Sequence, residues 1–193
     1  MFAKITFAAA LATVASAKCQ NPKLVEDFDA SRYMGTWYDI QKTKDCIYAP
    51  DNATCEQVYM SNLEEKSGKF DMLTTFQLPE KNGRDELALS GKCPTTDASC
   101  YISFFGISTL TPNYTVIDTD YDNYSIVYSC NWFLQKEVVH ILSRDPTPGH
   151  LTMESYREKV ETLLPKFNFK KFAPRSIQGE VCDYPEMVET IAQ

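Results

Sequence analysis

The sequence has few histidines and no closely spaced pair of cysteines, and these two absences limit the metal sites that it can form. Its 193 residues include two histidines, His140 and His150, and no Cys-x-x-Cys pair. A structural zinc site takes four cysteine or histidine ligands, which usually come from such closely spaced pairs. We therefore expect no metal site.

Basic residues are also scarce. Lysine and arginine number 19 against 26 aspartates and glutamates, which gives a net charge of −7, and no basic stripe interrupts the acidic chain. A protein that binds nucleic acid or an anionic lipid surface needs a concentration of positive charge. The composition therefore argues against both partners and agrees with a soluble extracellular protein.

Long apolar runs are missing as well. The main apolar stretch, residues 5–14, is shorter than the roughly 20 residues that cross a bilayer. Lys4 precedes it and small residues follow at positions 15 and 17, which is the pattern of a secretory signal peptide. We expect residues 1–17 to be this signal and no segment to span a membrane. Residues 18–193 are predicted to form a single secreted domain, because no repeat or linker divides them.

Seven cysteines follow that predicted signal. In an exported chain they predict disulfides in preference to metal ligands. Cys93 and Cys100 lie close enough in sequence for a local bridge, and the odd total makes one unpaired cysteine possible.

Asn-x-Ser/Thr sequons occur at Asn52, Asn113 and Asn123. Asn52 lies in an expected loop and is the best candidate for glycosylation, followed by Asn113. Asn123 falls in an expected tight turn, where a glycan is disfavoured.

Short extended segments recur along the chain. Each is rich in Val, Ile, Thr, Tyr and Phe, and a cluster of turn residues follows it. Asn82-Gly83 is such a turn, because both residues tolerate a positive φ. Eight evenly spaced strands in one acidic chain favour closure into an all-β, antiparallel up-and-down barrel, which removes the exposed edges. The expected strands are residues 36–42, 54–62, 69–78, 85–92, 100–108, 113–119, 124–132 and 136–144.

One later segment has the periodicity of a helix. In residues 151–164, Tyr156 and Val160 recur at helical spacing, and charged residues cover the opposite face. Thr152 is a suitable N-cap, and Pro165 ends the segment. We expect one helix after the eighth strand, packed against the outside of the barrel.

Three short motifs occur in a fixed order: Gly-Thr-Trp-Tyr at residues 35–38, Asp-Thr-Asp-Tyr-Asp-Asn-Tyr at 118–124 and Ser-Arg-Asp-Pro at 143–146. Together with the late helix, they resemble the three signature regions of the lipocalins, small secreted barrels that hold an apolar ligand. Residues 124–130 and the third motif are most similar to the branch that contains retinol-binding protein, apolipoprotein D, insect bilin-binding protein and crustacyanin. The resemblance covers essentially the whole chain after residue 17.

The resemblance implies two further disulfides, Cys19–Cys130 and Cys55–Cys182, which tie the terminal segments to barrel strands. Cys46 is then the odd cysteine. We interpret it as an unpaired or differently paired loop thiol, in preference to an intermolecular disulfide or a thioether to a reactive ligand at the barrel mouth. An unpaired Cys46 leaves a homo-oligomer possible.

The motif residues predict one closed end of the barrel. Trp37 after Gly35 is expected to fill the base, and the Arg144 guanidinium to stack on its indole for about 0.5–2 kcal/mol. Asp120 is expected to bond its own turn at 118–124. A calcium site there is disfavoured, because the glycine and distal glutamate of an EF-hand loop are missing. These roles are structural and say nothing about a ligand.

Strand alternation assigns the residues that face the interior, once the disulfide cysteines point out and Arg144 points in. The lining is mainly apolar and aromatic with a few polar points, which is typical of a small-molecule site, although side chains alone can also fill such a barrel. His140 is expected to donate to a ligand carbonyl or carboxylate and to titrate near neutrality. The expected ligand-binding residues are Glu56, Val58, Met60, Phe70, Met72, Thr74, Phe76, Ile102, Phe104, Tyr114, Val116, Val127, Ser129, Val138 and His140.

These features favour a carrier of a small hydrophobic ligand over an enzyme. The resemblance implies a retinoid, bilin, carotenoid or lipid. Aromatic walls suit a conjugated pigment, such as biliverdin or a carotenoid, although a fatty acid or retinoid fits the same walls. A lipid-modifying enzyme that uses Cys46 or Glu56 is the alternative of another class. No Ser-His-Asp set, paired acids or phosphate loop supports it, and we expect no catalytic cofactor. A barrel that serves only as an interaction scaffold is a third possibility.

Overall fold

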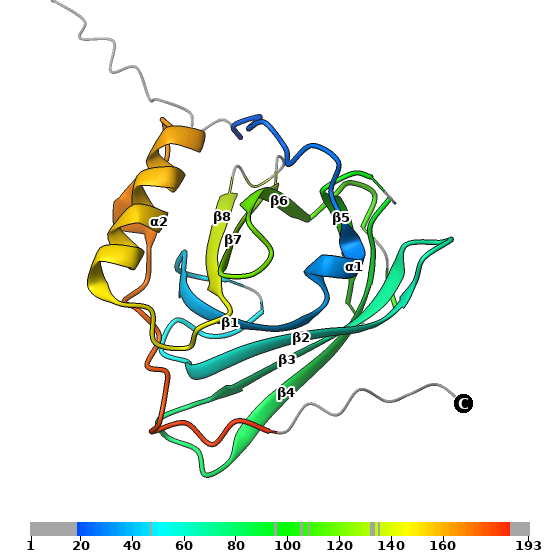
Figure 1. Cartoon of the computed structure of the whole chain (residues 1–193). Helices are drawn as coiled ribbons and strands as arrows, with labels where there is room; N and C mark the ends of the chain where they lie inside the picture. Colours follow the sequence, from blue (N-terminus) through cyan, green and yellow to red (C-terminus); the bar gives the residue numbers. More distant parts are fainter. Residues whose placement is uncertain are drawn as a thin grey trace, which may run out of the picture.

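The computed structural model of the protein describes residues 19–46, 48–94, 96–104, 106–107, 109–131, 134 and 136–185, so the predicted signal peptide lies outside the described residues. Eight strands in this part of the chain form a closed antiparallel barrel in sequence order (Figure 1). None of the helices within these ranges is long and apolar enough to cross a membrane. The strands are β1 (Gly35–Lys42), β2 (Thr54–Glu64), β3 (Lys69–Gln77), β4 (Arg84–Lys92), β5 (Ser99–Ser103), β6 (Tyr114–Thr119), β7 (Tyr124–Asn131) and β8 (Lys136–Ser143).

The predicted barrel is therefore confirmed; most strand ends agree to within one or two residues, and β5 is the strand that ends well before its expected limit. β5 ends at Ser103, whereas the sequence predicted strand as far as residue 108. Beyond it, Phe104 and Ile107 pair in an isolated bridge, because the chain turns back at Gly106 with φ of 76°. Residues 105 and 108 of the expected strand lie outside the described residues, and residues 109–113 belong to the loop before β6.

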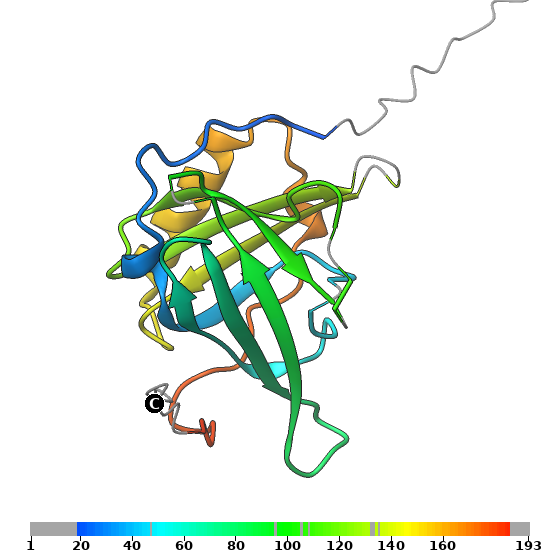
Figure 2. The ribbon, with the colours of Figure 1, turned by 90° about the vertical axis from the view of Figure 1, so that its right-hand side faces the viewer.

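The barrel has two different ends. The short β2–β3, β4–β5 and β6–β7 connections lie where β1 begins, and we call this the closed end; the other connections lie at the open end. The helix α1 (Ala30–Tyr33) lies at the closed end, and the β3–β4 hairpin projects at the open end (Figure 2). Gly68 is required in the β2–β3 turn: its φ is 69°, and a Cβ would lie 1.7 Å from the Cys93 carbonyl oxygen.

A bulge in β1 changes which of its residues face the interior. Ile40 is the extra residue between Asp39 and Gln41, where the pairing with β8 shifts. Ile40 and Gln41 therefore both lie on the outer side, and Lys42 returns to the interior, where it pairs with an inward glutamate of β2. The C-terminal segment covers the bulge, since the Ser176 N–H donates to the Ile40 carbonyl at 2.9 Å.

The helix α2 (His150–Leu163) packs against the outside of the barrel, as predicted (Figure 1). Its buried side chains Met153, Tyr156 and Val160 share a second hydrophobic core with the outward residues of β7 and β8. The predicted N-cap at Thr152 is wrong. The helix already begins at His150, after Gly149 and without a side-chain cap, because Thr152 lies inside the first turn.

Three disulfides are present in the described residues: Cys19–Cys130, Cys55–Cys182 and Cys93–Cys100. The first ties the N-terminal segment to β7. The second ties the C-terminal segment, which follows a short 3-10 helix η1 (Phe169–Lys171), to β2. Because each spans more than a hundred residues, both constrain the unfolded chain strongly. Cys46 forms no disulfide and is buried.

Candidate ligand-binding site

The closed end is filled by an aromatic and guanidinium plug. Trp37 is fully buried, and the Arg144 guanidinium carbon lies 3.6 Å from the centre of its ring. Arg144 also donates to the carbonyl oxygens of Thr36 at 2.6 Å and Met34 at 2.8 Å. The stacked indole shields the face of the guanidinium from water. The N–H groups at the edge of the guanidinium satisfy backbone carbonyls at the start of β1.

The turn between β6 and β7 is held by its own side chains. The Asp120 carboxylate accepts from the backbone N–H of Asn123 at 2.8 Å and of Tyr124 at 3.1 Å. These bonds lower the Asp120 pKa, although partial burial opposes them. The turn also supplies the Tyr121 carbonyl, which accepts from Arg144 Nε at 3.1 Å. All three motif regions therefore meet in one structural unit at the closed end.

Most residues predicted to bind a ligand are buried in the barrel interior. Glu56, Thr74 and His140 are buried there, and Ser129 is half-buried near the open end. Phe76 packs apart from the main cluster, against the loop between β1 and β2. The contacts place these side chains, whereas their binding to a ligand stays a prediction. The main interior cluster includes Val58, Met60, Phe70, Met72, Ile102, Tyr114, Val116 and Val127, with Phe104 and Val138 packed against it.

The half of the interior next to the closed end is filled by protein side chains. The Tyr33 hydroxyl is 3.0 Å from the Tyr114 hydroxyl and 2.8 Å from Ser125 Oγ, deep in the barrel. Burial raises the pKa of Tyr33 to about 12. Phe70 packs directly over Gly91, where a Cβ would come within 2.2 Å of the ring. Tyr114 and Phe70 are therefore walls of a packed core, and space for a ligand lies toward the open end.

A cavity of about 450 Å³ opens at that end, and we call it the mouth cavity. Its size falls within the range of small-molecule sites, roughly 300–1,000 Å³. Aromatic and aliphatic side chains form part of the wall, and hydroxyl and amide groups lie around it. The lining residues are Asp45, Cys46, Tyr48, Phe104, Thr109, Thr111, Pro112, Asn113, Ser129, Cys130, Asn131, Leu134, Lys136 and Val138.

Five ionisable side chains form a buried polar cluster at the open-end side of the barrel interior: Asp39, Lys42, Cys46, Glu56 and His140. Each is at most 9% exposed. His140 Nδ1 lies 2.7 Å from Asp39 Oδ2, and its Nε2 lies 3.5 Å from Cys46 Sγ. Lys42 Nζ forms an ion pair with Glu56 Oε1. Among the described residues, no group of three or more potential ligands is arranged to hold a metal ion.

The charges of this cluster are set by burial and by the partners that face each group. Burial lowers the pKa of His140, but the Asp39 carboxylate and the Cys46 sulfur outweigh it and raise the value to about 10. Burial likewise opposes the charge on Lys42, and the two carboxylates raise its pKa. For Glu56, burial and the negative Asp39 raise the pKa to about 8, against the pull of Lys42. The interior therefore holds two cationic side chains, His140 and Lys42, beside the Asp39 carboxylate. The raised pKa of Glu56 makes it the weaker of the two acids.

Several polar atoms in this region have no hydrogen-bond partner within the described residues. They include Asp39 Oδ1 and Thr74 Oγ1, whose side chains are at most 5% exposed, and Thr109 Oγ1 in the mouth cavity. An unpaired buried polar group costs about 1–3 kcal/mol. Of these three residues, Thr109 lines the mouth cavity, so its hydroxyl is the free polar group that a molecule bound there would meet.

The role predicted for His140 does not fit this geometry. A direct hydrogen bond to a ligand carbonyl or carboxylate needs a free ring nitrogen, and both nitrogens of His140 face protein partners, Asp39 and Cys46. Titration near neutrality is also wrong, because the pKa is raised to about 10. The cause is the buried carboxylate of Asp39, which the sequence pattern did not connect with His140.

Of the residues predicted to bind a ligand, Phe104, Ser129 and Val138 line the mouth cavity, and most of its other wall residues were missed because they lie in loops. Asp39, Lys42 and Tyr48, from the buried polar cluster and the cavity wall, show what sequence reasoning could and could not reach. Strand alternation from Trp37 does place Asp39 in the interior, so that residue was within reach. Lys42 was not, because alternation points it outward and the bulge at Ile40 reverses it. Tyr48 lies in the loop between β1 and β2, where no strand period applies. Its ring packs 5.4 Å from that of Phe104 at the mouth.

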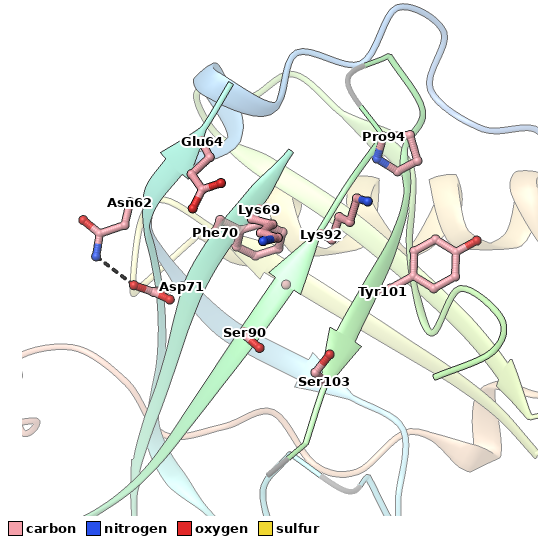
Figure 3. A pocket seen from close by; sticks show the side chains of 11 residues that line it. Asn62, Glu64, Lys69, Phe70, Asp71, Ser90, Lys92, Pro94, Tyr101 and Ser103 are labelled. Atoms are coloured by element: carbon pink, nitrogen blue, oxygen red, sulfur yellow. Dashed lines mark hydrogen bonds between the residues drawn. The ribbon is translucent and has the colours of Figure 1, made fainter. Parts of the chain in front are cut away.

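A larger hollow of about 630 Å³ lies on the outer face of β2 to β5 (Figure 3). Its walls include the exposed side chains of Lys69, Asp71 and Lys92, and Asn62 donates to Asp71 at 2.8 Å. Charged, hydrated walls suit an apolar ligand poorly. We therefore place the candidate site in the mouth cavity.

The two predicted glycosylation sites differ in accessibility. Asn52 is exposed in the loop between β1 and β2. The Asn113 side chain is half-buried and its amide nitrogen donates to the Ile102 carbonyl at 2.9 Å. The structure therefore favours Asn52 as the acceptor, and glycosylation itself stays a prediction.

Comparison with known proteins decides the family. The model of the Lipocalin / cytosolic fatty-acid binding protein family matches residues 34–172, which is most of the chain. This chain belongs to the lipocalin family. Apolipoprotein D of Mus musculus is 29% identical to this lipocalin over 133 residues, which are 67% of each protein. The Lazarillo protein of Schistocerca americana is 27% identical over 176 residues, 88% of this chain and 79% of that protein.

Solved structures agree with the fold. Insecticyanin from the tobacco hornworm Manduca sexta matches with a TM-score of 0.67 and 20% identity, over 86% of this chain and 89% of that one. At this identity the likeness shows the barrel and its outer helix. With the family match, it makes this lipocalin a ligand carrier and leaves the ligand to be identified.

Proposed function

We propose that this lipocalin is a secreted carrier of a hydrophobic pigment, a bilin such as biliverdin or a carotenoid, held at the open end of the barrel. The mouth cavity carries this proposal, because aromatic and aliphatic walls with a few polar groups suit a conjugated molecule. Tyr48 and Phe104 present aromatic rings to it, and Val138 an aliphatic side chain.

Polar groups around the cavity supply orientation. Asn113, Lys136 and Thr109 lie in its wall, where the propionates of a bilin or the ring oxygens of a carotenoid find donors. Secretion is supported by the predicted signal peptide and by disulfides, which persist in oxidising compartments. Retinoids and fatty acids fit the same walls and are the competing ligands.

The absorbance spectrum of the protein purified from its source, followed by organic extraction and mass spectrometry, tests the proposal. We expect a visible band and an extracted bilin or carotenoid. A colourless protein that releases only fatty acids or a retinoid would overturn the proposal of a pigment ligand and leave the proposed carrier function in place.

A pair of variants tests the location. Val138→Trp should fill the mouth cavity and weaken binding of added biliverdin or carotenoid by about tenfold or more, since packed interiors tolerate little added volume. Leu151→Trp, at a position of α2 that is 84% exposed, is the matched control and should leave the affinity unchanged. Equal binding by both variants would place the ligand elsewhere.

A further inference from the structure

Cys46, His140 and Asp39 are arranged as a nucleophile, a proton carrier and an orienting carboxylate. Cys46 Sγ lies 3.5 Å from His140 Nε2, and His140 Nδ1 lies 2.7 Å from Asp39 Oδ2. The Asp39 carboxylate accepts a hydrogen bond from His140 Nδ1–H, which turns Nε2 toward the sulfur. This is the geometry by which a thiol is activated in proteins, because an imidazolium beside it stabilises the thiolate.

The thiol is buried, yet it borders the place where a ligand would lie. Cys46 is 9% exposed and lines the mouth cavity. The Tyr48 ring packs 5.6 Å from the His140 ring and 5.4 Å from that of Phe104, so the sulfur is approached along an apolar wall. Access is therefore restricted to a molecule that enters the barrel.

A second observation concerns Asp39, which positions His140 and does not itself line the mouth cavity. Asp39 is 5% exposed, and its Oδ1 has no hydrogen-bond partner within the described residues. One carboxylate oxygen thus orients His140, and the other remains an open acceptor for a hydroxyl or amide of a ligand. A cysteine that served only to fill space would not need this polar support.

We propose that Cys46 captures α,β-unsaturated carbonyl ligands covalently, by conjugate addition inside the barrel. This inference rests on the proposed carrier function and names a chemical class of cargo. The sulfur lone pair forms a C–S bond to the β-carbon, and the C=C π electrons move toward the carbonyl to give an enolate. The proton on His140 Nε2 then passes to the α-carbon. No group leaves and nothing is oxidised or reduced, so the product keeps the full mass of the ligand.

Other thiol reactions fit the site less well. A disulfide to a second protein needs a thiol that reaches a sulfur buried at 9% exposure, and the other six cysteines are paired with one another. Acyl transfer needs a leaving group and then water for turnover. Conjugate addition needs only the nucleophile and the proton donor that the structure places beside it. His140 would act as the proton donor, and Asp39 as its positioning residue.

Intact-mass spectrometry with trans-3-nonen-2-one tests the proposal, because a ketone avoids the Schiff bases that aldehydes form with lysines. We expect one adduct per chain with the full mass of the enone, mapped to Cys46 and absent in Cys46→Ser. Its second-order rate at neutral pH should exceed that of N-acetylcysteine by about tenfold or more, as expected for general acid–base assistance. A slower rate, an unmodified Cys46 or an adduct lacking part of the enone would overturn the inference.

Variants separate chemistry from binding. At a saturating concentration of the enone, where weaker binding no longer limits the rate, His140→Gln and Asp39→Asn should slow adduct formation by about tenfold or more. If either fails to fold, the comparison of the wild-type protein with Cys46→Ser decides alone. Reversible binding of 2-nonanone without any enone adduct ends the covalent proposal and keeps the carrier. Absence of binding to either ketone and to biliverdin counts against the carrier itself.

Discussion

The two ends of the barrel solve the same problem, polar groups inside a β-barrel, in opposite ways. At the closed end, Arg144 stacks on Trp37 and donates to several backbone carbonyls, so that polar and aromatic groups complete one another. At the open end, Asp39 keeps an oxygen that has no partner in the part of the chain that the structure describes, and Cys46 keeps a thiol that faces a cavity. The difference teaches that one end is complete without a ligand, whereas the other is arranged to receive one.

The turn glycines give the largest expected contrast between the ends. Gly68→Ala at the closed end should lower the free energy of unfolding by about 3 kcal/mol, because positive φ and the contact with the Cys93 carbonyl both oppose a Cβ. Gly83→Ala at the open end shares a positive φ but has no atom within 4 Å of its Cβ, so the loss should be about 1 kcal/mol. Urea unfolding of both variants measures the difference. Equal losses would mean that backbone strain alone matters.

The guanidinium plug gives the next contrast. Arg144→Lys keeps the charge and removes the planar stacking and the forked donors, so we expect a loss of about 2 kcal/mol in the free energy of unfolding. Arg157→Lys is the control, because Arg157 lies 5.8 Å from the Phe169 ring outside the barrel; its loss should stay within about 0.5 kcal/mol. Ligand affinity should be unchanged in both variants if the closed end has no part in binding.

A third contrast concerns the pH dependence of the open end. The pKa of His140 is about 10 in the folded protein against 6.5 in an exposed histidine, so its contribution to stability is full below about pH 6.5 and is lost as the pH rises through 10. The pKa of Glu56 is about 8 in the folded protein against 4.5 in an exposed glutamate, so Glu56 acts in the same direction at lower pH. Its contribution to stability is full below about pH 4.5 and is lost as the pH rises through 8.

Urea unfolding between pH 5 and 10 separates the two groups. His140→Gln should flatten the fall in stability at the alkaline side and keep the fall between about pH 4.5 and 8. Glu56→Gln should do the reverse. If the wild-type stability rises with pH across this range, the assignment of charges in the buried polar cluster is wrong.

Much of the fold could be predicted because it follows from strand period and motif order. The eight strands, the outer helix and the pairing of Trp37 with Arg144 all have local or family signals. The end of β5 was missed, since the apolar pattern continues through Phe104 and Ile107, which lie on either side of the turn at Gly106. A hydrophobic pattern reports burial, and it does not report where hydrogen bonding to the next strand stops.

The candidate site could be predicted only in part. Interior positions such as Val138 and Phe104 follow from alternation, but alternation cannot tell a packed wall from a ligand contact. Tyr48 comes from a loop, and the loop's path depends on tertiary contacts. The link between His140 and Asp39 joins residues 101 apart in sequence, and only the register of β1 against β8 brings them together.

The bulge at Ile40 has a consequence for how this interior could evolve. In strict alternation, the neutral Gln41 would occupy the interior and the Lys42 ammonium would lie on the outer side. Glu56 would then lack its cation. The charge inside the barrel thus depends on which residues of β1 alternate inward as much as on which residues the strand contains. An insertion or deletion of one residue in β1 would rewrite the electrostatics of the pocket without changing a single side chain around it.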